Sequence, residues 1–302
     1  MTRAVLIGGT GFIGRWLGRA LRARGVEALS LSRKKPAGFD GEWAAAYVDD
    51  PASVVAHLQS GDLVAYLVHA GIPADTGDDY DREEQANVLP YARLLEAAAL
   101  ARPRLWLYCS SGGQVYGEQA RMPIPETARP APVTAYGRAK LAMEGLTRVT
   151  AETHDFGWLV VRPGNPYGPL QEQTNRHGAV PALLRAARDG TPFTAYGFSA
   201  TVRDYIYIVD AADAIAGLML GERNRVFNVG SGRGTTLAEL ARLAGEIVGN
   251  EVKLVFKPLR TFDVRQNVLD ISAISDSGWE PSVSLAEGLR FTWDYLRSHE
   301  TP

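Results

Sequence analysis

Residues 4–14 read AVLIGGTGFIG, a short apolar strand that runs directly into a glycine-rich turn and decides the fold. From Phe12 to Leu21 the apolar residues recur at helical spacing, so the turn leads into a helix. Glycines in this pattern permit a tight turn, a close approach of the backbone to a pyrophosphate, and close packing of the helix on the sheet. Phosphates would meet the helix N-terminus, whose unpaired N–H groups and dipole favour negative charge. The strand–turn–helix context favours a dinucleotide site over a turn without ligand, and the expected cofactor-binding residues are Gly8, Gly11, Phe12, Ile13 and Gly14.

Strands and helices alternate through the first half of the chain. Apolar runs predict strands at 26–31, 44–48, 63–68, 105–109 and 157–161, and helical spacing predicts helices at 84–102 and 134–153. Such alternation is typical of parallel βαβ units. Proline and glycine crowd residues 163–169 and predict a loop, after which short mixed elements follow. We therefore expect an α/β protein: a Rossmann-type doubly wound parallel sheet with a smaller mixed α/β substrate-binding domain.

The composition narrows the classes of partner. The 302 residues include 32 Lys+Arg and 34 Asp+Glu, so the formal net charge is -2 and no nucleic-acid partner is expected. The single cysteine, Cys109, lies in the apolar run LWLYC and excludes an internal disulfide; with only five histidines, no metal site is expected. No apolar run approaches the ~18 residues of a membrane span, and no signal peptide is evident. We expect a cytoplasmic protein with no membrane partner.

The residues at the end of the second strand bear on the choice of dinucleotide. An acidic side chain at this position binds the ribose 2′-hydroxyl of NAD, whereas a nearby arginine accommodates the 2′-phosphate of NADP. This chain has Ser32-Arg33-Lys34-Lys35 and no carboxylate there. Because Ser32 and Arg33 are hydrogen-bond donors suited to a phosphate, the pattern leans toward NADP(H), and NAD stays open. A solvated basic strand end is the other interpretation.

A tyrosine and a lysine stand four residues apart on the helix predicted at 134–153. The sequence Tyr136-Gly-Arg-Ala-Lys140 places both side chains on one face. Tyrosine with its ordinary pKa of ~10 is a poor base at neutral pH, but a neighbouring ammonium lowers that pKa. The tyrosine then removes a proton from a substrate hydroxyl while hydride leaves the carbon for a nicotinamide. Alone, such a pair would be a surface contact; behind a dinucleotide loop, it predicts that Tyr136 and Lys140 are catalytic and bind the cofactor.

Taken in order, these motifs resemble the extended short-chain dehydrogenase/reductase family, and within it the nucleotide-sugar epimerases. The resemblance runs nearly end to end. After the glycine loop come Asn87, SSGGQVYG at 110–117, the Tyr136/Lys140 pair, RPGNPYGP at 162–169, RDYIYIVDAADAI at 203–215, FNVGSG at 227–232 and RTFDVRQNVLDIS at 260–272. Several motifs in one order are far more specific than any one of them.

The resemblance implies a nucleotide-diphosphate sugar as the substrate. Asn165 would contact the diphosphate, Arg203 and Arg260 would clamp the pyrophosphate, and Asp263 would orient the ribose or its adjacent loop. It also implies that residues 1–166 with about 203–229 form the dinucleotide-binding Rossmann domain. About 167–202 with 230–302 would form the nucleotide-sugar-binding domain. A homodimer packed through the helices near 84–102 and 134–153 is expected as well.

One position departs from the family pattern. Four residues before the tyrosine of the V-Y-G motif, the family places a serine or threonine that bonds the reacting hydroxyl, and this chain has Gly112. Ser111 is adjacent, and the two following glycines permit unusual backbone angles. We therefore expect Ser111 to take the hydroxyl role.

Three functions are consistent with the sequence. The leading hypothesis is an epimerase, acting at C4 of a UDP-hexose or similar nucleotide sugar through a 4-keto intermediate. The alternative is an NADPH-dependent 4-ketoreductase of a nucleotide-linked keto sugar, which Ser32–Lys35 supports. A further alternative, supported only by Gly112, is a non-catalytic dinucleotide-binding sensor.

Overall fold

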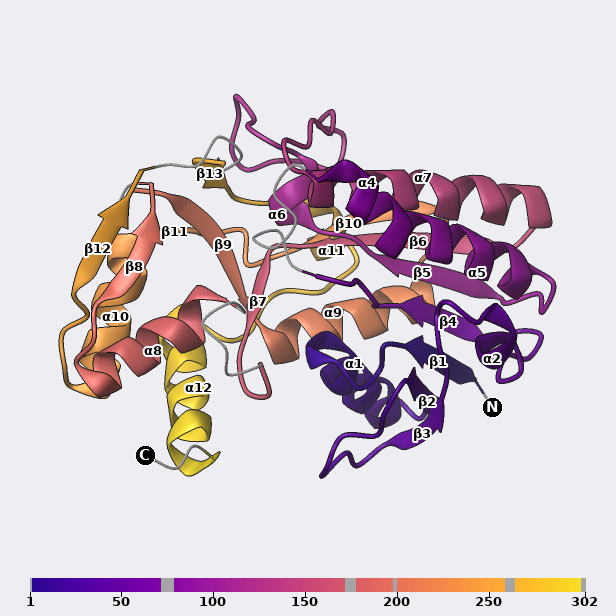
Figure 1. Ribbon diagram of the computed structural model, residues 1–302, viewed down its shortest axis with the longest axis horizontal. Helices are drawn as coiled ribbons and strands as arrows, with labels where there is room; N and C mark the ends of the chain where they lie inside the picture. Colours follow the sequence, from indigo (N-terminus) through magenta and orange to yellow (C-terminus); the bar gives the residue numbers. More distant parts are fainter. Residues whose placement is uncertain (1, 72–78, 172–177, 198–199, 259–263, 300–302) are drawn as a thin grey trace.

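A seven-stranded sheet forms one side of the computed structural model, which describes residues 2–71, 79–171, 178–197, 200–258 and 264–299 (Figure 1). All neighbouring strands in it are parallel. In spatial order the strands are β10 (Arg225–Val229), β6 (Gly157–Pro163), β5 (Leu105–Cys109), β4 (Leu63–Tyr66), β1 (Arg3–Ile7), β2 (Glu27–Ser32) and β3 (Glu42–Ala45). The order reverses beside β1, as in a doubly wound sheet, which confirms the predicted fold class.

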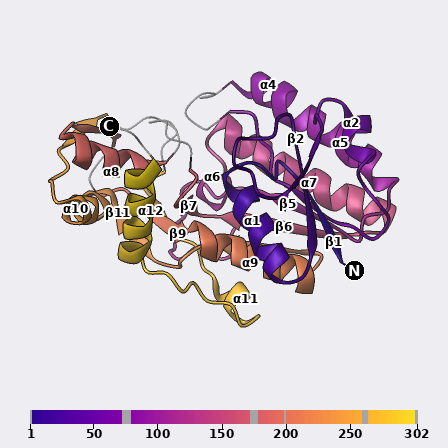
Figure 2. The ribbon, with the colours of Figure 1, turned by 90° about the horizontal axis from the view of Figure 1, so that it is seen from below.

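Helices cover both faces of this sheet. On one face lie α1 (Phe12–Ala23) and α9 (Ile208–Gly221), seen together in Figure 2. On the other lie α2 (Pro51–Val55), α5 (Leu89–Ala99) and α7 (Ala135–His154). Strands covered on both faces carry continuous apolar runs, and all five residues of β5 are buried, Cys109 among them.

The second half of the chain builds a smaller, mixed part. Strand β9 (Val202–Tyr207) pairs with β7 (Asn165–Tyr167), β11 (Gly234–Thr236) and β13 (Gln266–Asn267). Strands β8 (Phe193–Tyr196) and β12 (Leu254–Lys257) form a separate pair. Helices α8 (Ala179–Asp189), α10 (Leu237–Val248) and α12 (Leu285–His299) share a hydrophobic core with this part. Two further short helices are α6 (Gly112–Val115) and α11 (Ser272–Ser275).

Three predicted elements are different in the structure. The loop expected at 163–169 contains the end of β6 and the strand β7; Pro166 is tolerated there because β7 pairs only with β9, on one side. The helix expected at 84–102 is α4 (Tyr80–Glu83), a π-helical turn η1 (Glu84–Val88) and then α5. The strand expected at 44–48 is β3, whose register with β2 starts at Glu42.

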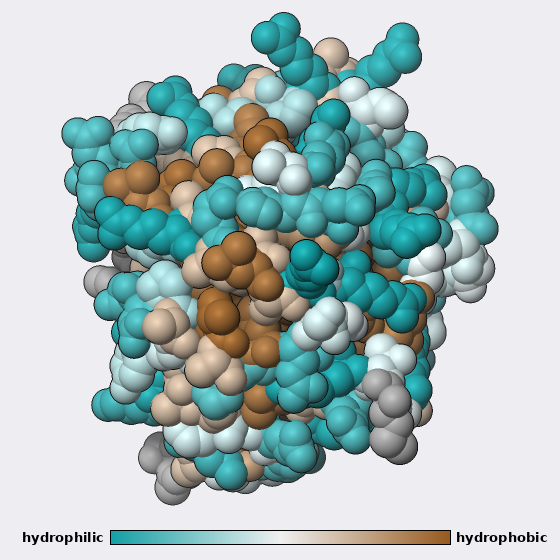
Figure 3. Space-filling view, turned by 90° about the vertical axis from the view of Figure 1, so that its right-hand side faces the viewer, coloured by the Kyte–Doolittle hydropathy of each residue, from teal (hydrophilic) through white to brown (hydrophobic). Residues whose placement is uncertain are grey.

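The surface is mixed in character. Figure 3 faces the end of the molecule at the right of Figure 1, where hydrophilic side chains dominate and apolar ones gather near the middle. None of the helices in the described ranges is both long enough and apolar enough to cross a bilayer.

Candidate active site

The glycine loop forms a cradle between β1 and α1. Gly8 has φ +88°, a conformation that side chains disfavour, and a Cβ on it would lie 2.9 Å from Val68. A Cβ on Gly14 would lie 2.6 Å from the Gly8 oxygen, so only glycine lets α1 begin this close to the loop. Gly11 is the N-cap of α1 and provides no side-chain cap for the first N–H groups. The loop therefore fits a dinucleotide pyrophosphate, because its glycines leave room for a close approach to the uncapped N–H groups at the start of α1.

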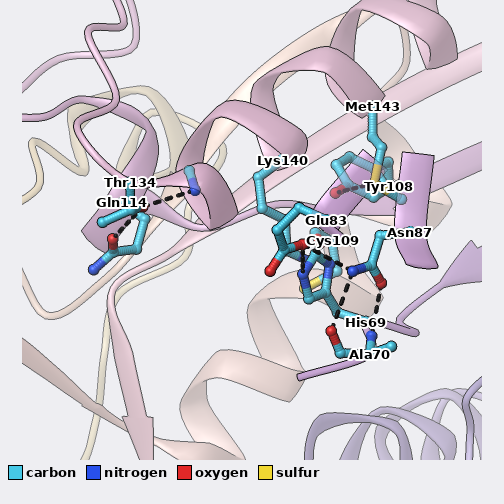
Figure 4. A network of polar contacts seen from close by, with 11 residues as sticks. His69, Ala70, Glu83, Asn87, Tyr108, Cys109, Gln114, Thr134, Lys140 and Met143 are labelled. Atoms are coloured by element: carbon cyan, nitrogen blue, oxygen red, sulfur yellow. Dashed lines mark hydrogen bonds and ion pairs between the residues drawn. The ribbon is translucent and has the colours of Figure 1, made fainter. Parts of the chain in front are cut away.

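The segment after β4 carries a buried histidine and is anchored by the helix that follows. His69 Nε2 lies 3.1 Å from Glu83 Oε2, and Asn87 Nδ2 donates to the same oxygen at 2.8 Å (Figure 4). Asn87 also holds the segment itself, accepting from Ala70 N at 2.7 Å and donating to Ala70 O at 3.1 Å. The Glu83 side chain is 0% exposed and that of His69 is 8% exposed. Because Val68 touches Gly8, this segment borders the glycine cradle.

Helix α7 brings Tyr136 and Lys140 to the end of β5. Thr134 caps the helix by accepting a hydrogen bond from Gly137 N at 2.9 Å. Lys140 Nζ donates to Cys109 O at 3.0 Å and lies 5.6 Å from the centroid of the Tyr136 ring. The His69 and Tyr136 rings meet edge to face with centroids 4.5 Å apart. The predicted pair thus lies on one face, as expected, and contacts the segment that borders the glycine loop.

The protonation state of the pair is governed by burial. Burial raises the pKa of Tyr136 well above its ordinary value, Cys109 and Glu83 raise it further, and a hydrogen bond from Ser111 lowers it. The sequence interpretation expected a lowered pKa, and the structure gives the opposite direction because desolvation of a phenolate outweighs its favourable contacts. Burial also lowers the pKa of Lys140, opposed by the nearby Cys109, Glu83 and Glu144.

Ser111 reaches the tyrosine, and Gly112 has no room for a side chain. Ser111 is the N-cap of α6, and its side chain hydrogen-bonds to Tyr136. A Cβ on Gly112 would lie 2.8 Å from Leu269 Cδ1 and 2.9 Å from Arg162 O. The hydroxyl that the family places at this position has no space here, and the hydroxyl beside the phenol comes from the preceding residue.

A second buried carboxylate, Glu144, lies one turn beyond Lys140. It accepts hydrogen bonds from Ser110 Oγ and from two nitrogens of Arg162, at 3.0 Å and 2.6 Å. Arg162 also donates to the Tyr116 hydroxyl, which donates to Asn228. The two side chains of the ion pair are 5% and 7% exposed. This network joins α7 to β6, to β10 and to Ser110, the residue directly after β5.

The residues expected to recognise the 2′-position lie at the end of β2. Ser32 Oγ donates to Lys34 O at 2.9 Å and accepts from Trp43 Nε1 at 2.8 Å, so its hydroxyl proton is already used. Arg33 is exposed. Of the two residues that suggested NADP, Arg33 alone has its donors at the surface.

The expected substrate residues lie on neighbouring strands of the smaller sheet. Asn165 Nδ2 donates to Asp204 O at 3.0 Å. Arg203 donates to Val264 O at 2.7 Å, and this contact places it beside the segment that follows residues 259–263. Arg260 and Asp263 lie outside the described residues. Asn267, the partner of Arg203 in the register of β13 and β9, donates to Gly112 O at 2.9 Å and so joins this sheet to the start of α6.

Sequence reasoning missed His69, Glu83 and the Glu144–Arg162 pair. A usable signal existed for Glu83, which stands four residues before Asn87, the spacing of one helical face. His69 follows an apolar strand, and the carboxyl ends of parallel strands are where such sheets bind ligands.

Comparison with known proteins identifies the family of this chain. Residues 4–230 match the profile described as the NAD dependent epimerase/dehydratase family. The chain belongs to the NAD-dependent epimerase/dehydratase family. The chain is therefore an enzyme of this family, whose name specifies a nicotinamide dinucleotide, and the resemblance found in the sequence is confirmed.

Relatives in the epimerase/dehydratase family match over nearly the full length. UDP-glucose 4-epimerase of Mycolicibacterium smegmatis is 31% identical, over 98% of this chain and 99% of the relative. dTDP-6-deoxy-L-talose 4-dehydrogenase (NAD(P)(+)) of Kitasatospora kifunensis is 34% identical, over 96% and 94%. The solved structure of UDP-glucose 4-epimerase from Thermotoga maritima with UDP-glucose superposes with a TM-score of 0.90 at 29% identity, covering 98% of this chain and 99% of that one.

Proposed function

We propose that this enzyme is a nucleotide-sugar 4-epimerase acting on a UDP-hexose or a similar nucleotide sugar. The observation that carries the proposal is the Ser111–Tyr136–Lys140 arrangement at the end of β5, next to a glycine cradle. The epimerases from Mycolicibacterium smegmatis and Thermotoga maritima, similar over their whole length, support it. A nicotinamide dinucleotide held by this cradle would supply reversible hydride acceptance at C4 of the sugar.

The residues of the chain handle the proton that accompanies the hydride. In its phenolate form, which burial disfavours in this structure, the Tyr136 oxygen takes the proton of the C4 hydroxyl and returns it to the 4-keto sugar after the sugar has turned over. Ser111 hydrogen-bonds at the same phenol, and Lys140, held by Cys109 O, offers the positive charge that stabilises a phenolate. The glycine loop of Gly8, Gly11 and Gly14 with the N-terminus of α1, at Phe12 and Ile13, would hold the pyrophosphate of the dinucleotide.

A second candidate is an NADPH-dependent 4-ketoreductase of a nucleotide-linked keto sugar. The raised pKa of Tyr136 favours it, because a protonated phenol is the form that gives a proton to a carbonyl. The similarity to the 4-dehydrogenase from Kitasatospora kifunensis also supports it.

The substrate would lie across the two parts of the chain. We infer that residues 1–166 with about 203–229 form the dinucleotide-binding domain and about 167–202 with 230–302 the nucleotide-sugar-binding domain, with β7 and β9 of the smaller sheet crossing this boundary. Asn165, Arg203 and Arg260 are the proposed diphosphate ligands, and Asp263 is proposed to orient the ribose or its adjacent loop. Guanidinium groups suit this task because they bind phosphate oxygens two at a time.

The dinucleotide would be NAD or NADP, and Arg33 is the residue that supports NADP. If it binds the 2′-phosphate, Arg33→Ala raises the Kd for NADPH about tenfold and leaves the Kd for NADH unchanged. Equal effects on both would leave NAD as the cofactor. Titration of each dinucleotide against intrinsic fluorescence measures this.

We also propose a homodimer through α5 and α7, which pack side by side. Leu100 and Val149 are 79% and 62% exposed at these helices. Val149→Glu would give monomers in sedimentation experiments. The control is Val209→Glu, on the opposite face in α9, where Val209 is 38% exposed. A monomeric wild type would overturn the proposal.

The function is tested by measuring how much cofactor is consumed for each molecule of product formed. Purified protein is incubated with UDP-glucose and a trace of NAD, and the products are separated by ion-exchange chromatography. An epimerase forms the 4-epimer with only catalytic cofactor, whereas a reductase consumes NADPH in proportion to an added keto sugar. Neither product with any nucleotide sugar tested would overturn both candidates.

A further inference from the structure

His69 is a buried polar side chain of this site that takes no part in the proposed chemistry. It lies after β4, between the glycine cradle, reached through Val68 and Gly8, and the ring of Tyr136. Figure 4 shows Lys140 descending from α7 to the same cluster of side chains. The groups that face His69 are Glu83 from α4 and Tyr136 and Lys140 from α7.

The hydrogen bonds around Glu83 define which imidazole nitrogen carries the proton. Asn87 Oδ1 accepts from Ala70 N, so its Nδ2 is a donor, and one of its contacts is Glu83 Oε2. A carboxylate that accepts from Asn87 also accepts from His69, so Nε2 is the protonated nitrogen. Nδ1 is then an acceptor with a free lone pair.

In the described part of the chain, nothing donates a hydrogen bond to that acceptor. Nδ1 of His69 is buried and has no hydrogen-bond partner among the described residues. Burial lowers the pKa of His69 to about 4, with Lys140 contributing in the same direction and Glu83 opposing, so the ring is neutral at pH 7. A neutral, carboxylate-oriented imidazole with an unsatisfied buried acceptor is expensive unless something donates to it.

We propose that His69 is a ligand-binding residue: Glu83 orients the imidazole so that Nδ1 accepts a hydrogen bond from a hydroxyl of the ligand held against Tyr136. The hydroxyl belongs to a ribose of the dinucleotide or to the sugar of the substrate, since the histidine borders both the glycine cradle and the tyrosine. This inference rests on the proposed function in that it takes these two ligands from it. Glu83 is a positioning residue that acts through His69.

Two substitutions separate the two nitrogens. His69→Gln places an amide where Nε2 lies and keeps a donor for Glu83, but removes the acceptor at Nδ1. His69→Asn places an amide where Nδ1 lies and loses the contact with Glu83. The matched control is His154→Gln: His154 and Glu96 form the same kind of pair at 3.2 Å on the outside of α7 and α5. For Glu83→Gln the control is Glu84→Gln, the next residue along the chain.

The readouts are the Kd for NADH from tryptophan fluorescence, the KM and kcat for UDP-glucose, and the thermal unfolding midpoint. Loss of one neutral hydrogen bond predicts that His69→Gln weakens one of the two ligands by about 3- to 10-fold. His69→Asn should bind that ligand more nearly as the wild type does. A change in the Kd for NADH assigns the hydroxyl to the dinucleotide, and a change confined to the KM for UDP-glucose assigns it to the sugar. Glu83→Gln should weaken the same ligand, while both control variants bind as the wild type does.

The proposal is overturned if both histidine variants bind both ligands as the wild type does, or if both weaken them equally with a lowered unfolding midpoint. The latter pattern would mean that His69 only holds the fold. These outcomes are distinct from failure of the proposed function. If wild-type protein binds NADH but does not turn over any nucleotide sugar, the function fails, and the NADH measurements still decide the role of His69.

Discussion

Two buried glutamates, Glu83 and Glu144, act on the same lysine and are built in different ways. Glu144 is bound to a permanent cation, since Arg162 donates to both of its oxygens and Ser110 donates as well. Glu83 faces a neutral imidazole and an amide, with Lys140 as the nearby cation. In the Glu144 arrangement, both carboxylate oxygens accept hydrogen bonds from protein donors, and the contacts join α7 to β6. The Glu83 arrangement keeps one acceptor, His69 Nδ1, without a partner among the described residues, as a ligand-binding group requires.

The largest effect is expected on kcat at Tyr136, whose ring contacts the His69 that Glu83 binds. Tyr136→Phe removes the phenol that transfers the proton, so kcat should fall by about 10²- to 10⁴-fold. The Glu144 network does not include this hydroxyl, so the free energy of unfolding in urea should change by less than ~1 kcal/mol. Turnover that survives in Tyr136→Phe would show that another group carries the proton.

For the Glu144–Arg162 pair, we expect the main effect on the free energy of unfolding. Arg162→Met leaves a buried carboxylate without its cation and should reduce the free energy of unfolding by about 3–5 kcal/mol. His69→Gln leaves Glu83 a donor and should cost less than ~1.5 kcal/mol. The double variant Glu144→Leu/Arg162→Met should recover much of the loss, because no buried charge remains. If urea melts show that Arg162→Met and His69→Gln reduce the free energy of unfolding equally, the proposed difference between the Glu144 and Glu83 sites is wrong.

Lowering the pH should destabilise the fold through His69, the neutral partner of Glu83. His69 is neutral in the fold with a pKa of about 4, whereas in the unfolded chain it takes a proton near pH 6.5. Its contribution to stability is therefore fully present above pH 6.5 and is lost as the pH falls toward 4, by up to about 3 kcal/mol. Urea melts at pH 7, 5.5 and 4 should show this loss in wild type and in His154→Gln. The loss should be reduced in His69→Gln; an identical loss in all three proteins would contradict the assignment.

The smallest effects are expected at Ser111 and Gly112, which lie between Glu83 and Glu144 in the sequence. Ser111→Ala removes the hydrogen bond at Tyr136 and should lower kcat about tenfold without unfolding the protein. Gly112→Ser restores the hydroxyl of the family but forces a side chain against Leu269, and should cost about 1–3 kcal/mol of stability without raising kcat. A faster Gly112→Ser enzyme would show that the loop adapts. Urea melts and steady-state rates measure both.

Short-range sequence patterns predicted much of the fold. The run AVLI followed by spaced glycines, and the alternation of apolar strands with helical patterns, predicted the doubly wound sheet, which is confirmed. The π-helical turn at 84–88 and the strand β7 were not predicted, because propensity at these places favours a continuous helix and a loop. Pairing with β9 makes residues 165–167 a strand, and such pairing is a long-range property.

The sequence by itself determined the family, the glycine cradle and the spacing that puts Tyr136 and Lys140 on one helix face. These follow from residue type and short-range periodicity, and the catalytic roles stay predictions. The tertiary structure alone decided that Ser111 and not residue 112 meets the phenol, that burial raises the pKa of Tyr136, and that His69 and Glu83 join the site. Desolvation and unpaired hydrogen-bonding groups depend on which distant segments pack together, and no local pattern encodes them.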